Sequence, residues 1–117
     1  MFETKGRTIR LSAGDTGLIG FEVEGVQVGE NDLAVFTVRK QNGELMMEKV
    51  LLPEDNVYML PFLNQDTEQW REGEYMWDLR IALDAQTDAQ GHVTDGREVI
   101  TPFPPGVLRI VKVVGRI

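Results

Sequence analysis

Short segments in which apolar and polar residues alternate recur along the chain, and clusters of glycine, asparagine, aspartate and proline separate them. In one such segment, Ile19, Phe21 and Val23 alternate with glycine and glutamate. Alternation with a period of two places the apolar side chains on one face of a β-strand. The pattern predicts eight strands, which span residues 8–11, 18–24, 33–40, 45–52, 57–63, 74–84, 97–101 and 107–114.

Helix and strand compete most closely in the segment 74–84. A helix would place Trp77 and Ile81 roughly opposite the other large apolar residues, whereas a strand aligns all of them on one face. The polar segment 64–70, in contrast, has helical propensity and predicts a single turn of helix. We therefore expect segment 74–84 to form a strand, with a buried face that carries Tyr75, Trp77, Leu79, Ile81 and Leu83.

Turn residues indicate how these strands are connected. The Asn42-Gly43 pair tolerates positive φ and predicts a hairpin between the third and fourth strands. The fourth strand has no clear inward face, which favours a position near a sheet edge. Pro61 removes a backbone donor from the fifth strand, which indicates an edge or a bulge. Residues 85–95 are polar and predict a long exposed hairpin loop.

Strands at this spacing, without crossover helices, predict an all-β fold. A two-sheet β-sandwich of about 7–9 strands is favoured, with a small β-barrel as the second choice. No internal repeat or linker divides the chain, so we expect residues 1–117 to form a single β-sandwich domain. The composition, with 42% hydrophobic and 26% charged residues, fits one soluble globular domain.

Composition also excludes several kinds of site and partner. The chain has no cysteine, which excludes a disulfide scaffold, a zinc–thiolate site and a cysteine nucleophile. No apolar run approaches the roughly 18 residues of a membrane span, and the first ten residues lack the apolar stretch of a signal peptide. The net charge of −7 argues against nucleic acid or an anionic membrane as a partner. We expect a soluble protein that is made in a cytoplasm.

Several segments resemble small tail proteins of Gram-positive phages and prophages, and are similar to the amino-terminal domain of the upper baseplate protein. They lie in the same order along most of the chain, but none is a catalytic signature. The resemblance implies an immunoglobulin-like antiparallel β-sandwich that is a structural part of a virion or prophage tail, synthesised in the bacterial cytoplasm. The chain departs from the baseplate protein by ending soon after the sandwich. The segments are 7–21 with its Gly14-Asp15-Thr16-Gly17 turn, 34–40, 66–67, 73–80 and 101–106.

Tyr75 allows two interpretations. Its position at the start of a predicted strand resembles a tyrosine corner, in which the hydroxyl bonds back to the connecting loop. Trp77 would then occupy the position, two residues further on, that a cysteine fills in antibody domains. In the other interpretation, Tyr75 is a core aromatic residue with a hydroxyl that reaches solvent.

The basic residues are concentrated at the two ends of the chain. Residues 1–10 carry a net charge of +2 and residues 103–117 carry +3, so residues 11–102 carry −12. If the first and last strands are neighbours, the two ends form one basic edge. The last strand is also apolar on both faces, which favours cover by a second copy or by a neighbouring tail protein. The predicted assembly edge comprises Arg7, Arg10, Val107, Arg109, Val111, Lys112 and Val113. Alternatively, the basic ends are solvated surface and the last strand is buried within a monomer.

The sequence favours no catalytic centre and no cofactor. Ser12 is the only serine and His92 the only histidine; they fall at a strand end and in the exposed loop, so we expect no nucleophilic triad and no enzyme. Asp84, Asp88 and Asp95 lie in one polar segment, but their spacing does not match the calcium-binding loop of EF-hands. We expect a solvated acidic loop and no bound metal.

Trp70 gives the alternative function. It lies outside the predicted strands, and β-sandwiches often present aromatic residues to sugar rings, so Trp70 could contact a carbohydrate ligand. The competing interpretation is that Trp70 caps the sandwich end beside Tyr75. The leading hypothesis is a non-enzymatic structural protein of the virion tail, and the alternative is a carbohydrate-binding module.

Overall fold

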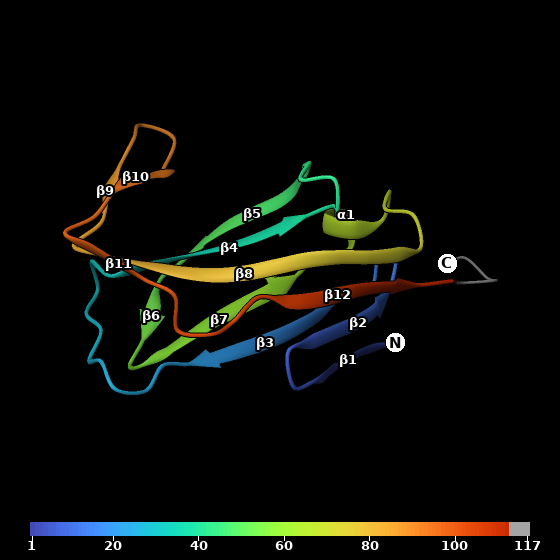
Figure 1. Ribbon diagram of the computed structural model, residues 1–117, viewed down its shortest axis with the longest axis horizontal. Helices are drawn as coiled ribbons and strands as arrows, with labels where there is room; N and C mark the ends of the chain where they lie inside the picture. The colour runs from blue at the N-terminus through green and yellow to red at the C-terminus, as the bar shows by residue number, and fades with distance from the viewer. Residues whose placement is uncertain (113–117) are drawn as a thin grey trace.

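Twelve strands and one helical turn make up residues 1–112, which the computed structural model describes (Figure 1). Seven strands have five residues or more; together with the short strand at residues 98–100 they correspond to the eight predicted strands, and four further short strands were not predicted. The elements are β1 (Phe2–Lys5), β2 (Thr8–Ser12), β3 (Gly17–Glu22), β4 (Leu33–Arg39), β5 (Leu45–Leu51), β6 (Pro53–Glu54), β7 (Val57–Phe62), α1 (Asn64–Thr67), β8 (Gly73–Leu83), β9 (Gln86–Thr87), β10 (Val93–Asp95), β11 (Glu98–Ile100) and β12 (Gly106–Val111).

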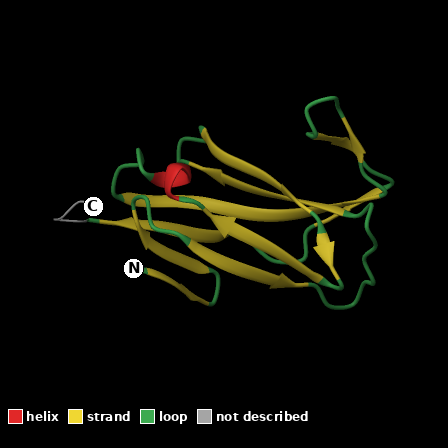
Figure 2. Ribbon diagram, turned by 180° about the vertical axis from the view of Figure 1, so that it is seen from behind, coloured by secondary structure: helices red, strands yellow, loops and turns green. Residues whose placement is uncertain are grey.

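Two sheets pack face to face, as Figure 2 shows from behind. The larger sheet has the order β1-β2-β12-β8-β4-β5, and β11 pairs with the second half of β8. The smaller sheet has the order β3-β7-β6. This arrangement confirms the predicted all-β sandwich. It departs from a purely antiparallel one in a single pairing, because β12 runs parallel to β2.

The long strand β8 supplies one wall of the core, as its alternation predicted. All five residues of its predicted buried face have exposed fractions of 7% or less. The Trp77 ring lies 5.5 Å from that of Phe21 and 5.7 Å from that of Phe36, measured between ring centroids. Ala82, which the alternation places on the other face of the strand, is also buried, because Gly96 of the following segment packs against it.

The two predicted strands with an irregular pattern, 45–52 and 57–63, also have defined positions in the sheets. The strand β5 lies at the edge of the larger sheet, as expected, and it buries Met47 and Leu51 while Leu45 stays exposed. Pro61 lies in β7, which pairs with β3 along its length and with β6 only at residues 57–58. Beside Pro61, β7 therefore has a strand on one side only, which is where a residue without a backbone N–H is tolerated.

The hairpin between β9 and β10 projects from one end of the sandwich (Figure 1). It confirms the exposed hairpin that the polar residues 85–95 predicted. The strand β1 was not predicted, because three of its four residues are polar and exposed. It pairs with β2 across a turn at Gly6 and Arg7, in which Gly6 has a φ of 59°.

The tyrosine corner is present. The Tyr75 hydroxyl donates a hydrogen bond of 2.8 Å to the carbonyl oxygen of Arg71, four residues earlier. The hydroxyl therefore ties the loop before β8 to the start of that strand. Trp77 is buried two residues further on, in the place where antibody domains have a cysteine.

Stability should fall in alkali because of Tyr58. Its side chain is buried and its hydroxyl donates to the carbonyl oxygen of Asp32 at 2.5 Å. Burial, followed by the nearby Asp32 carboxylate, raises the pKa of Tyr58 from 10.0 to about 12. The stability that the protonated phenol contributes is complete below the unfolded-state pKa near 10 and is lost as the pH rises through about 12. Urea unfolding from pH 9 to 12 should show a decline that is shallower in Tyr58→Phe; equal slopes would contradict this assignment.

Candidate interaction surface

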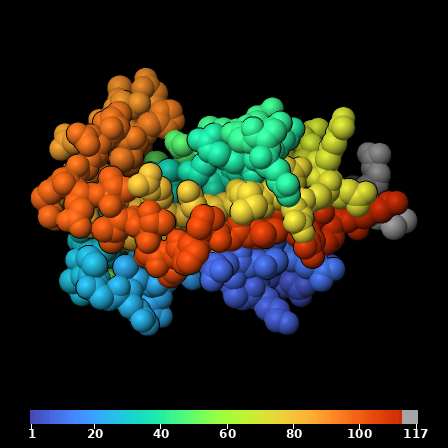
Figure 3. All heavy atoms as spheres, viewed as in Figure 1, coloured from blue at the N-terminus to red at the C-terminus, as the bar shows by residue number. Residues whose placement is uncertain are grey.

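The predicted neighbours at the two ends of the chain do lie side by side. The strands β2 and β12 pair in parallel, with Arg10 beside Arg109 and Thr8 beside Val107. One part of the expectation is wrong, however: β12 is not an edge strand, because it lies between β2 and β8. The true edge is β1, which folds back on β2 and covers it. Figure 3 shows β12, in red, at the surface between the blue strands and yellow β8.

Charged residues of both signs form a row across four strands on this face. Arg10 and Arg109 occupy the middle, with Glu3 opposite Arg10 on β1 and Glu74 opposite Arg109 on β8. The Arg10 guanidinium lies 3.3 Å from the Glu3 carboxylate, and Arg109 is paired with Glu74. We call these four residues the charge row. The predicted basic edge is thus a row of both signs, because strands β1 and β8 each add a carboxylate.

Partly exposed apolar residues flank the charge row. Val107 lies opposite Met76 of β8, which is 40% exposed, and Val111 is also partly exposed. Leu108 and Ile110 point the other way and are buried in the core. The outer face of β12 therefore combines apolar and charged side chains, whereas its inner face belongs to the sandwich. These positions and the charge row form the candidate assembly surface.

The remaining predicted assembly residues have different positions. Arg7 lies in the turn between β1 and β2, where its carbonyl oxygen accepts hydrogen bonds from the Trp77 indole at 3.0 Å and the Val107 amide at 3.1 Å. Lys112 is exposed just after β12. Val113 lies outside the described residues. Sequence reasoning missed Glu3, although the Gly6-Arg7 pair is a turn signal that could have revealed β1.

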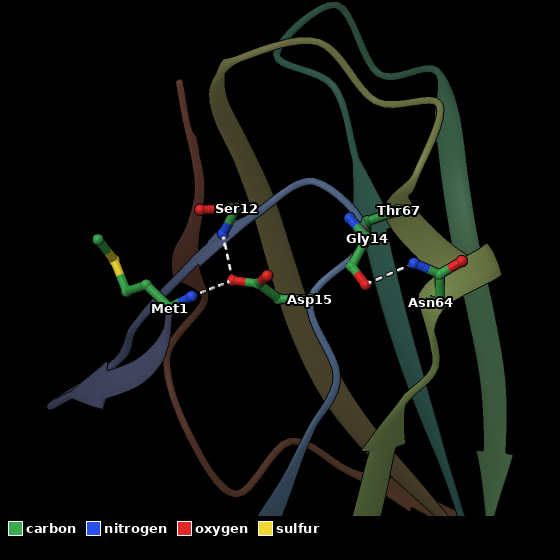
Figure 4. Close-up of polar contacts among 6 residues, drawn as sticks. All are labelled: Met1, Ser12, Gly14, Asp15, Asn64 and Thr67. Carbon is green, nitrogen blue, oxygen red and sulfur yellow. Dashed lines mark hydrogen bonds and ion pairs between the residues drawn. The ribbon is translucent and has the colours of Figure 1, made fainter. Parts of the chain in front are cut away.

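The Gly14-Asp15-Thr16-Gly17 turn has a structural role (Figure 4). Asp15 Oδ2 accepts hydrogen bonds from the Ser12 amide at 2.9 Å and the Met1 nitrogen at 2.6 Å. The Gly14 amide donates to the buried Thr67 hydroxyl, and its carbonyl oxygen accepts from Asn64 Nδ2. The turn thus joins the larger sheet to α1. Asp15 thus bonds to the backbone within the turn itself, whereas no hydrogen bond of the Thr16 side chain is found within residues 1–112.

Trp70 lies beside Tyr75, as expected if it caps the end of the sandwich. Its ring is half-buried against the core, and its centroid is 5.0 Å from that of Tyr75. One ring face is therefore used within the protein, and no other observation favours a sugar platform there.

The residues that the sequence analysis considered for catalysis or metal binding do not form a site. Ser12 is buried at the end of β2, whereas His92 is exposed in the β9–β10 hairpin at the opposite end of the molecule (Figure 1). In that hairpin, hydrogen bonds from the amides of His92 and Gln90 lower the pKa of the Asp88 carboxyl. Asp84 pairs instead with Arg97 at 2.7 Å. These carboxylates are thus engaged in local contacts.

Three further observations bear on the class of protein. Within residues 1–112, no helix has the length and apolar character needed to cross a membrane. In that same part of the chain, no three histidine, aspartate or glutamate side chains are grouped so that they could hold a metal ion. Comparison with protein families, curated proteins and solved structures found no match.

Proposed function

We propose that the protein is a non-enzymatic structural component of a phage or prophage tail or baseplate, and that it works by protein–protein assembly. The resemblance to phage tail proteins supports the setting. The candidate assembly surface supports the mode of action, and the observation that carries it is the charge row with partly exposed apolar residues beside it. Protein interfaces combine apolar contact area with polar and charged groups, as this surface does.

The partner is a second copy or a neighbouring tail protein. Because the charge row reads acid, base, base, acid, a second copy displaced along it can place carboxylates against guanidinium groups. Exposed ion pairs within one chain contribute little to its own stability, so these side chains can exchange partners at small cost. Such a contact weakens as salt screens the charges.

Self-association should therefore depend on salt. Multi-angle light scattering should give a mass above that of the monomer at about 50 mM salt and a mass near it at about 1 M, where the screening length is only about 3 Å. The double variant Arg10→Gln, Arg109→Gln should stay monomeric at low salt, because it removes both central positive charges.

The matched control is Arg71→Gln, Arg97→Gln, which makes the same change in net charge at two exposed arginines that belong neither to the charge row nor to the apolar residues beside it. It should assemble like the unmodified protein. A monomer at every concentration and salt would contradict self-association, and assembly of the Arg10, Arg109 variant would contradict the role of the charge row.

The tail setting needs a separate test. In a bacterium that carries the coding sequence, an epitope tag on the protein should co-purify with induced particles and appear on their tails by immunoelectron microscopy. The Arg10→Gln, Arg109→Gln variant should be depleted from those particles. Particles that lack the tag entirely would contradict the proposal.

A further inference from the structure

The smaller sheet has an unpaired edge at β3. Its order is β3-β7-β6, so β3 has a neighbouring strand on one side only. In immunoglobulin constant-type sandwiches, the first strand of the chain completes this four-stranded sheet beside the second. Here β1 and β2 both belong to the larger sheet. Among residues 1–112, the position beside β3 therefore holds no strand.

A cavity of about 240 Å³ opens beside this edge, between the two sheets. The β1–β2 hairpin and β3 form its two side walls, and β8 and the segment before β12 form its base. Most of its lining is apolar or aromatic. The residues that matter here are Thr4, Ile9, Ile19, Phe21, Trp77 and Phe103.

We propose that β3 is a strand-addition site that accepts an extended segment of a partner protein. The backbone of the segment pairs with the open side of β3, where alternate N–H and C=O groups have no strand to bond. Because successive side chains of a strand point to opposite faces, every second side chain of the segment enters the cavity. The site therefore selects segments with apolar residues at alternate positions.

The charges beside the cavity indicate an acidic residue at one end of the segment. Arg7, in the β1–β2 turn, lines the cavity; its side chain is exposed and belongs to no ion pair among the described residues. Glu22, on β3, is the one carboxylate of residues 1–112 that lines the cavity. The acidic residue of the segment therefore belongs at the turn, beside the Arg7 guanidinium.

A partner segment fits this site better than the β3 strand of a second copy. In such a copy, Phe21 is buried in its own core and Ile19 packs against it. Pairing of two β3 strands would satisfy both edges but leave both cavities unfilled. An extended segment has side chains available for the cavity.

The test uses a synthetic peptide of about eight residues, in which valine and serine alternate after two aspartates. NMR titration of the monomeric protein at the lowest working concentration should shift the Trp77 indole signal. Hydrogen exchange should slow at alternate β3 amides. It should not slow at β5, the edge of the other sheet, so the protection is specific to the proposed site.

Two variants of adjacent residues on β1 provide the matched comparison. Thr4 lines the cavity, whereas the exposed side chain of Lys5 lies on the other face of the same strand. Thr4→Trp should fill the cavity and weaken peptide binding about tenfold or more, and Lys5→Trp should leave it unchanged. Replacement of the peptide aspartates by lysines should also weaken binding.

Three outcomes would overturn the inference: no binding at millimolar peptide, equal binding to Thr4→Trp, or protection of β5 instead of β3. Protection of β3 that appears without peptide and increases with protein concentration would assign the edge to a second copy. These readouts do not involve the outer face of β12, so they are independent of the test of the assembly surface.

Discussion

Replacement of Trp77 by alanine is expected to lower the free energy of unfolding by about 3–5 kcal/mol, a large share of the stability of a domain of this size. Trp77 is only 4% exposed, and its ring packs between those of Phe21 and Phe36. Its indole N–H also donates to the Arg7 carbonyl oxygen. Removal of the ring leaves a cavity in the centre of the core and takes away one of the two hydrogen bonds that the Arg7 carbonyl oxygen accepts. Urea unfolding monitored by circular dichroism measures the loss.

Trp70→Ala is the matched control for this prediction. Trp70 is half-buried at the rim, and its main aromatic contact is Tyr75. The expected loss is about 1 kcal/mol, because much of the space that the ring vacates is open to water. Equal losses for the two tryptophans would show that the assignment of core and rim is wrong.

Gly106→Ala is expected to cost about 3 kcal/mol, the upper end of the usual range for one methyl group added to a packed site. Gly106 is buried at the start of β12, and a Cβ atom there would overlap both the Arg7 carbonyl oxygen and the Trp77 indole. The Arg7 oxygen accepts two hydrogen bonds, so the backbone cannot move without weakening them. Chemical denaturation should show a lower midpoint with an unchanged m-value.

Gly29→Ala tests whether loss of glycine is harmful in general. Gly29 is exposed, and a Cβ atom there would meet only an Asp32 carboxylate oxygen at 3.7 Å. Its expected effect is within about 0.5 kcal/mol. A comparable loss in both variants would contradict the steric explanation for Gly106.

The strands with a strong period of two could be predicted from sequence because each has one face in the core. In β8, five apolar residues at alternate positions leave no other arrangement that buries them all. The hairpin after β4 was equally clear, since Asn42 and Gly43 suit its turn and Gly43 has a φ of 92°. Such signals are local, and they hold whichever strands are neighbours.

The assembly surface could be predicted only in part, because it depends on pairings between distant segments. The proximity of Arg10 and Arg109 followed from an expectation about sandwich topology, and the structure confirms it. The compensating carboxylates Glu3 and Glu74 were missed. Glu3 lies on a strand with too few apolar residues to be recognised, and Glu74 becomes a neighbour of Arg109 only through the register of β8 and β12.

The unpaired edge of β3 was not foreseen for a similar reason. Alternation in Ile19 and Phe21 shows which way the side chains point but carries no information on how many neighbours a strand has. That number is set by the sheet to which β1 and β2 are assigned, and their own alternation fits either sheet.

The parallel pairing of β2 with β12 also constrains the order of events during synthesis. At about 5–20 residues per second, the roughly 90 residues between the two strands take on the order of 5–20 seconds to be made. Throughout that interval, the β1–β2 hairpin has no strand to join, because among residues 1–112 only β12 connects it to the rest of its sheet. Closure of the larger sheet must therefore be among the last steps of folding. The nascent chain is most exposed to mispairing with other chains just before β12 emerges.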